Sequence, residues 1–214
     1  MEIYEALYTT RAMRRLKPDP IPYEVQARIL DAAIRAPHIG EGWRFILVDD
    51  PEIKAQFAPL YRQGFEKMVG GRLEDVFGDV MKTDTPMGRT VRSGYHLVEH
   101  FHEVPLFLIG FGKTVEGSGI YPALWNAMLA ARAEGIGSTL TGFLQSYFSS
   151  EVMDILGVPK DAGWKLHGVV PMGYPLGKWG VGPRKPVHEV AARNSWQGDL
   201  GFTVPEPLWP RQNP

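Results

Sequence analysis

Hydrophobic residues recur at helical spacing in several separate stretches of this chain. Ile3, Leu7 and Tyr8 predict a short helix within the first ten residues. A longer helix is predicted for residues 23–35, with Pro22 as its first residue, and an alanine-rich helix for residues 121–134. Such amphipathic helices need an apolar surface against which to pack.

Short apolar runs supply candidates for that surface. Residues 44–48, 104–111 and 166–174 are predicted as buried strands. Asp50 and the Pro51-Glu52 pair after the first run are typical of a helix start, with a capping side chain and a proline at the first position. Helices and strands alternate without a regular βαβ cadence, so we expect an α+β fold with a single domain, residues 1–214.

Other stretches have weaker patterns. Residues 69–92 combine several glycines with mixed charge, and we interpret them as a mobile excursion. Ser149 or Ser150 is predicted to cap a short helix that ends at Leu156. Beyond Ala192 the tail is rich in proline and aromatic residues, so we expect it to be extended. It would be buried either by wrapping around a partner subunit or by packing on its own domain.

Composition narrows the chemistry. The net charge is −1, so there is no broad cationic field for a nucleic acid. The absence of cysteine excludes disulfides, thiolate nucleophiles and cysteine-based metal sites. His96, His100 and His102 lack a carboxylate at ligand spacing, so no metal is expected. With no signal-like or membrane-spanning stretch, the expected location is the cytoplasm.

Anion binding must therefore be local. Arg11 and Arg14 are three residues apart at the end of the first predicted helix, where both can reach one dianionic phosphate. A solvated basic surface is the alternative explanation for the same residues. The spacing alone does not separate the two.

Three segments resemble the nitroreductase family. The first, residues 9–22, reads TTRAMRRLKPDPIP, a basic cluster followed by a proline-rich stretch. The second, residues 121–142, is a long helix followed by a glycine-rich turn, and the third, residues 173–189, contains GYPLGKW and then PRKPV. The resemblance implies a central, mainly antiparallel sheet flanked by helices, in a homodimer with shared sites and a C-terminal extension.

The resemblance also implies a chemistry. It predicts FMN as cofactor, NAD(P)H as reductant, and a nitroaromatic, quinone or related electrophile as acceptor. Arg11 and Arg184 match phosphate-binding positions; Arg14 either joins them or lies near the N1–O2 edge of the flavin. Thr141, through its backbone or its hydroxyl, and Gly142 match positions that face flavin N5 and O4. The flavin carries the chemistry, so no catalytic side chain is expected. The implied cofactor-binding residues are Arg11, Ala12, Met13, Arg14, Pro37, His38, Ile39, Thr141, Gly142, Arg184 and Lys185.

The sequence departs from the family pattern on the ring-binding side. The segment from Pro37 to Trp43 is about two residues shorter than in relatives and lacks their Asn and Gln, and Trp125 replaces a common Gln. Each lost hydrogen bond could weaken flavin binding by ~1 kcal/mol. Three outcomes remain open: backbone donors and His38 substitute, Trp125 stacks on or narrows the pocket, or flavin affinity is much reduced. The last corresponds to a ligand-sequestering protein with little turnover. A third interpretation keeps an enzyme but changes its chemistry to reductive dehalogenation, flavin fragmentation or the use of a deazaflavin cofactor.

Overall fold

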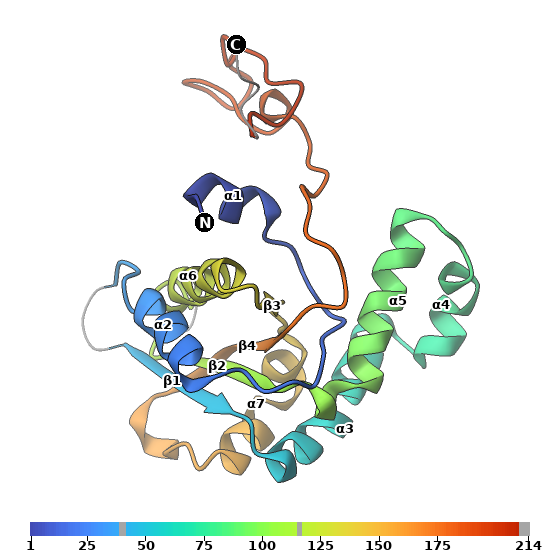
Figure 1. Ribbon diagram of the computed structural model, residues 1–214, viewed down its shortest axis with the longest axis vertical. Helices are drawn as coiled ribbons and strands as arrows, with labels where there is room; N and C mark the ends of the chain where they lie inside the picture. Colours follow the sequence, from blue (N-terminus) through green and yellow to red (C-terminus); the bar gives the residue numbers. More distant parts are fainter. Residues whose placement is uncertain (39–41, 115–116, 210–214) are drawn as a thin grey trace. The chain divides into compact units, whose positions relative to one another are not determined.

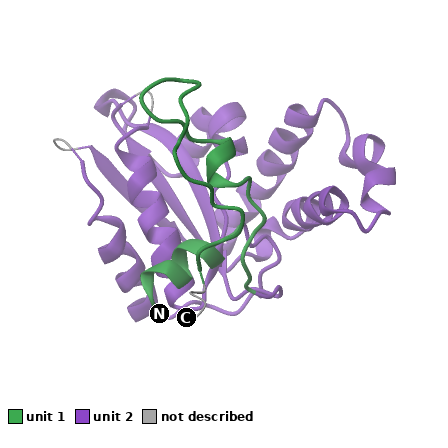
Figure 2. Cartoon of the chain, turned by 90° about the horizontal axis from the view of Figure 1, so that it is seen from above, with its two compact units in different colours: residues 1–11, 179–214 green, residues 12–178 purple. Residues whose placement is uncertain are grey.

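The chain forms two compact units, which Figure 2 shows in different colours. The computed structural model describes residues 1–38, 42–114 and 117–209. Ala12–Lys178 form the larger unit, and Met1–Arg11 with Trp179–Pro214 form the smaller one. The expectation that residues 1–214 make one domain stays a prediction.

The larger unit is built on a four-stranded sheet. Its strands are β1 (Trp43–Val48), β2 (Leu106–Gly112), β3 (Gly137–Ser138) and β4 (Lys165–Gly173). They pair in the order β1-β2-β4-β3, and every pairing is antiparallel. The three predicted strands and the α+β class are therefore confirmed.

Strand β2 is buried along its whole length, and its side chains alternate between the two faces of the sheet. Leu106 and Leu108 belong to the core on one face, whereas Phe107, Ile109 and Phe111 belong to the core on the other. An unbroken apolar run thus serves two hydrophobic layers at once.

Helices cover both faces of this sheet (Figure 1). The core on one face includes α2 (Tyr23–Ala33) and α6 (Ile120–Ala133). The opposite core includes α3 (Pro51–Val69) and α7 (Phe143–Ile155), together with the short 3₁₀ helix η1 (Phe101–Glu103). The larger unit is thus a three-layer arrangement of helices, sheet and helices.

The helix ends follow from the local sequence. Asp50 caps α3 by accepting hydrogen bonds from the N–H groups of Glu52 at 2.8 Å and Ile53 at 3.0 Å. That helix ends at Gly70 with φ of 79°, a conformation that favours glycine. Pro22, which was predicted to be the first helical residue, is instead the N-cap, and α2 begins at Tyr23.

The short helix predicted from Ser149 or Ser150 to Leu156 corresponds to the second half of α7. Helix α7 begins at Phe143, but Phe148 has non-helical angles, with φ of −143° and ψ of 31°. A second helical stretch thus begins just after Phe148. The capping pattern marked a kink inside the helix instead of its first residue.

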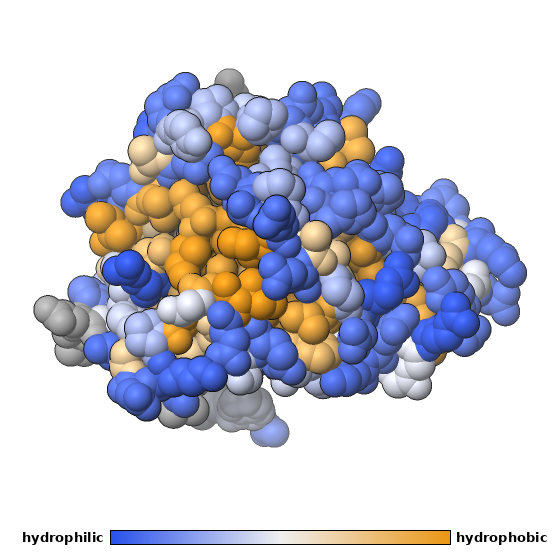
Figure 3. Space-filling model, turned by 90° about the horizontal axis from the view of Figure 1, so that it is seen from below, coloured by the Kyte–Doolittle hydropathy of each residue, from blue (hydrophilic) through white to orange (hydrophobic). Residues whose placement is uncertain are grey.

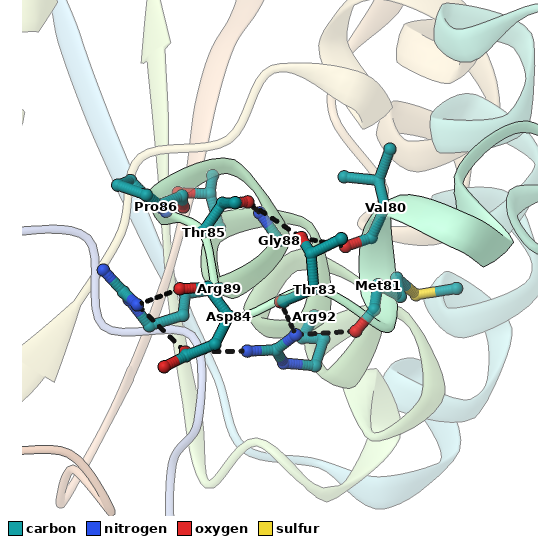
Figure 4. Close-up of polar contacts among 10 residues, drawn as sticks. Val80, Met81, Thr83, Asp84, Thr85, Pro86, Gly88, Arg89 and Arg92 are labelled. Carbon is teal, nitrogen blue, oxygen red and sulfur yellow. Dashed lines mark hydrogen bonds and ion pairs between the residues drawn. The ribbon is translucent and has the colours of Figure 1, made fainter.

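The segment after Val69, predicted as a mobile excursion, forms helices, and its mobility stays a prediction. It contains α4 (Leu73–Met81) and α5 (Pro86–Glu99). The two helices are joined by a turn in which the Asp84 carboxylate forms ion pairs with two arginines (Figure 4). Arg89 donates to Asp84 Oδ1 at 2.9 Å, and Arg92 lies 3.7 Å from the same atom while donating to two main-chain carbonyls. The buried face of α5 includes two glycines, which weakens the hydrophobic pattern that would have revealed the helix.

The smaller unit contains α1 (Ile3–Thr9), as predicted, and the 3₁₀ helix η3 (Val187–Glu189); a further 3₁₀ helix, η2 (Lys160–Ala162), lies in the larger unit. The described tail is otherwise without helix or strand, and Trp196 is 96% exposed. Figure 3 shows one face of the molecule on which hydrophobic residues gather among hydrophilic ones. Among the described residues, no helix is both long and apolar enough to cross a membrane.

Candidate functional site

The segment that follows α1 is bound to the edge of the sheet. Met13 N–H donates to the Ser138 carbonyl at 2.9 Å, and Ala12 forms a parallel bridge with the same residue. Two residues further on, the Arg15 carbonyl accepts from Leu176 N–H at 2.9 Å. These bonds fix the backbone on both sides of Arg14 beside β3.

Packing explains one glycine of the sequence motif, and backbone conformation explains another. A Cβ on Gly137 would lie 2.8 Å from the Met13 Cβ and 3.1 Å from that of Pro175, so this position admits no side chain. Gly135 has φ of 76°, which a residue with a side chain adopts only with strain. Neither glycine requires a ligand, so the ligand argument depends on the residues that follow them.

Thr141 is buried, and both of its backbone groups are occupied. Its N–H donates to the Val169 carbonyl at 2.9 Å, and its carbonyl accepts from Val169 N–H at 3.1 Å. The side-chain hydroxyl donates to the Tyr61 hydroxyl oxygen at 3.3 Å. Of the two groups that the sequence left open at Thr141, only the hydroxyl can turn to a ligand without breaking the bridge.

Tyr61, on α3, is 2% exposed and held by aromatic neighbours. Its ring stacks on Phe101 with centroids 3.9 Å apart and contacts Phe143 at 5.5 Å. Burial raises the pKa of Tyr61 to about 12, against the opposing influence of the Thr141 hydrogen bond and the Arg14 charge. Its phenol therefore stays protonated at neutral pH.

Gly142 is the N-cap residue of α7. The first N–H groups of a helix have no acceptor within the helix, and they carry a partial positive charge. The turn at Thr141 and Gly142 thus leads from a side-chain hydroxyl directly into the first main-chain N–H groups of α7. Such an arrangement suits the acceptor atoms of a polar ring.

Arg14 contributes a positive charge to the same unit. Its Nη1 donates to Ser93 Oγ on α5 at 3.4 Å, and its charge acts on Tyr61. Arg14, Ser93, Tyr61 and Thr141 all belong to the larger unit. Sequence reasoning missed Ser93 and Tyr61: Tyr61 follows the apolar spacing of α3 and looks like a core residue, and Ser93 lies in the segment predicted as an excursion.

The smaller unit carries the other predicted cations. Arg11, Arg184 and Lys185 are exposed, and none of them forms an ion pair within residues 1–38, 42–114 and 117–209. Arg184 and Lys185 line a groove of about 850 Å³ together with residues of α1 and the tail, and Arg184 Nη1 donates to the Pro183 carbonyl at 2.9 Å. These uncompensated cations fit a dianionic phosphate.

The shortened loop is only partly described. Pro37 and His38 are exposed, and the His38 ring lies 4.1 Å from the Trp43 ring, centroid to centroid. Trp43 in turn donates to the Gly119 carbonyl at 3.0 Å. Ile39 lies outside the described residues. The Trp125 side chain is 43% exposed on α6 and available for contact.

Comparison with known proteins covers most of the chain. The model of the family described as "Nitroreductase family" matches residues 7–108 and 114–174. Among solved structures, an iodotyrosine deiodinase bound to FMN and 3-iodo-L-tyrosine is similar with a TM-score of 0.68 and 21% identity, over 91% of this chain and 99% of that one.

Two further structures have similar scores. Nitroreductase A from Vibrio parahaemolyticus RIMD 2210633 gives a TM-score of 0.67 at 18% identity, over 92% of this chain and 78% of that one. A nitroreductase with bound FMN from Desulfitobacterium hafniense DCB-2 gives 0.64 at 19% identity, over 86% and 96%. At these identities the likeness shows the fold.

Proposed function

The chain belongs to the nitroreductase family, and we propose that it is an FMN-dependent oxidoreductase that passes hydride from NAD(P)H to a nitroaromatic, quinone or related electrophile. The observation that carries the proposal is the Thr141–Gly142 turn at the start of α7, with Arg14 in the same unit. A hydroxyl, the first N–H groups of a helix and a positive charge are groups that can stabilise the polar atoms of a flavin ring.

The phosphate of FMN would be held by Arg11 and Arg184, with Lys185 nearby. The proposal draws on their exposure and on the lack of an acidic partner in the described chain. Guanidinium groups bind phosphate with paired, charge-assisted hydrogen bonds. Arg14 either adds to this set or stabilises negative charge at the N1–O2 edge of the ring.

FMN, when bound, supplies the redox chemistry by accepting a hydride from the nicotinamide and delivering it to the acceptor. The chain's own residues would bind and orient. Thr141 and Gly142 would face N5 and O4. Ala12, Met13, Pro37, His38 and Ile39 would be neighbours of the cofactor, as the resemblance implies.

We also propose a homodimer. Trp196 at 96% exposure and Leu208 at 68% would leave much apolar area in water in a lone chain. Burial of such side chains contributes roughly 25 cal/mol per Å². Sedimentation equilibrium tests this: we expect twice the 23.9 kDa chain mass, and loss of the dimer on truncation before Trp196.

Cofactor uptake tests the main proposal most directly. The purified protein is mixed with FMN, freed of unbound flavin and examined by visible absorption, and NADH or NADPH is then added without oxygen. We expect a retained flavin band that bleaches. A protein that takes up no FMN at micromolar concentration contradicts the proposal and favours the ligand-sequestering alternative.

The phosphate assignment has its own test. The double substitution Arg11→Ala with Arg184→Ala removes two charge-assisted bonds, each worth about 1.5–3 kcal/mol, so FMN affinity should fall by at least about a hundredfold. Arg35→Ala with Lys160→Ala removes the same charge from two exposed ion pairs and serves as control. Equal FMN affinities in the two double variants would refute the assignment.

A further inference from the structure

We infer that Tyr61 is a positioning residue that accepts the hydrogen of the Thr141 hydroxyl and thereby keeps the Thr141 oxygen as a hydrogen-bond acceptor for the reduced cofactor ring. The inference rests on the proposed function, since it takes flavin N5 to lie beside Thr141. Its basis in the structure is the hydroxyl pair: Thr141 Oγ1 lies 3.3 Å from the Tyr61 oxygen, in a buried place.

The hydroxyl of Thr141 is its one polar group outside the bridge with Val169. The two hydrogen bonds with Val169, at 2.9 and 3.1 Å, use its N–H and its carbonyl. They also fix the backbone, so the side chain must respond to a ligand by turning its hydroxyl hydrogen. A hydroxyl has one hydrogen to donate and two lone pairs to accept.

Tyr61 is suited to hold the hydroxyl in one orientation. Its ring stacks on Phe101 and contacts Phe143, so the phenol oxygen keeps its place. Burial keeps the phenol protonated, with a pKa of about 12, so its oxygen is a neutral acceptor at ordinary pH. The hydrogen bond runs from Thr141 to Tyr61, which leaves the lone pairs of the Thr141 oxygen free to accept from another donor.

A ring atom that changes from acceptor to donor responds to this orientation. Oxidised flavin N5 accepts a hydrogen bond, whereas the hydride taken from NAD(P)H adds hydrogen and two electrons, so that reduced N5–H donates. With the oxidised ring, Thr141 must turn its hydrogen from Tyr61 to N5. With the reduced ring, N5–H donates to Thr141, which donates to Tyr61, the direction found in this structure. The pair only turns; it transfers no proton.

Tyr61→Phe separates the two states. The oxidised ring keeps its hydrogen bond from Thr141, so the affinity for oxidised FMN should stay within about twofold of wild type. With the reduced ring, the Thr141 hydrogen loses its buried acceptor, which disfavours that state. We expect the ratio of reduced to oxidised flavin at a fixed potential to fall about tenfold, a shift of about 30 mV for a two-electron couple.

The experiment measures two quantities on the FMN-loaded protein: affinity for oxidised FMN by fluorescence quenching, and midpoint potential by equilibration with a reference dye. Tyr95→Phe is the matched control, because it removes a phenol that donates to Glu74 away from the turn. Thr141→Val removes the partner hydroxyl, and Thr141→Ser retains it. Thermal unfolding confirms that each variant folds.

We expect a lower midpoint potential for Tyr61→Phe, no shift for Tyr95→Phe, and no further effect of Tyr61→Phe in the Thr141→Val background. Thr141→Ser should respond to Tyr61→Phe as wild type does. A wild type that binds FMN while Tyr61→Phe leaves the potential unchanged overturns this inference alone. So does a shift that persists in Thr141→Val. A wild type that binds no FMN overturns the proposed function and this inference with it.

Discussion

Substitution of Gly137 by alanine should displace the segment that carries Arg14. The new Cβ would lie 2.8 Å from the Met13 Cβ, an atom next to the backbone that cannot rotate away. To relieve this contact, either the backbone pairing at Ser138 must break or Met13 must move. Overpacking of this kind costs about 2 kcal/mol, which lowers Tm by roughly 4–8 °C in a chain of this length.

Gly135→Ala provides the matched control. Its Cβ meets nothing within 4 Å, but φ of 76° makes it strained, at a cost of about 1–2 kcal/mol. Both variants should therefore melt earlier, whereas only Gly137→Ala should weaken FMN binding, by about tenfold if one Arg14 hydrogen bond is lost. Thermal unfolding and FMN titration measure the two effects. An unchanged Tm in Gly137→Ala, or equal FMN affinities in the two variants, would refute the reasoning.

Three further predictions follow from named contacts. Asp50→Ala should lower the free energy of unfolding by about 1 kcal/mol in urea titrations, while Asp50→Asn keeps the cap and should be near neutral. Arg92→Ala should speed hydrogen exchange in residues 73–99, whereas Lys82→Ala, which removes an exposed pair, should not; equal rates in both would count against a role for the turn. The pKa of Tyr61 is about 12 in the folded protein and about 10 in the unfolded chain. The contribution of protonated Tyr61 to the free energy of unfolding is therefore complete below pH 10 and is lost as pH rises toward 12. Urea unfolding at pH 9 and 11 should therefore show a steeper loss in wild type than in Tyr61→Phe, and parallel losses would contradict this.

Much of the fold could be predicted because its signals are local. The apolar runs of β2 and β4 and the cap at Asp50 are read within a few residues, and each is confirmed. Helix α5 escaped prediction because glycines occupy its buried face, so its packing depends on the aromatic ring of Phe65 brought near Gly94 by the fold. The kink at Phe148 likewise separated a capping pattern from the true helix start.

The site was harder to predict, since its geometry arises from contacts between distant residues. Thr141 could be singled out by resemblance, but Val169 and Tyr61, which decide which of its groups is available, lie far away in the sequence. Nothing in the spacing of Tyr61 distinguishes it from the core aromatics of α3. Only the tertiary contact turns a packing residue into a partner of the site.

The proposed cofactor residues divide between the two compact units. Arg11, Arg184 and Lys185, assigned to the phosphate, belong to the smaller unit, whereas Arg14, Thr141 and Gly142, assigned to the ring, belong to the larger one. On the proposed assignment, the shortened loop at Pro37 and the exposed Trp125 would affect the ring end of FMN and leave the phosphate residues unchanged. The midpoint potential, more than the affinity, therefore reports whether the ring is held for hydride transfer.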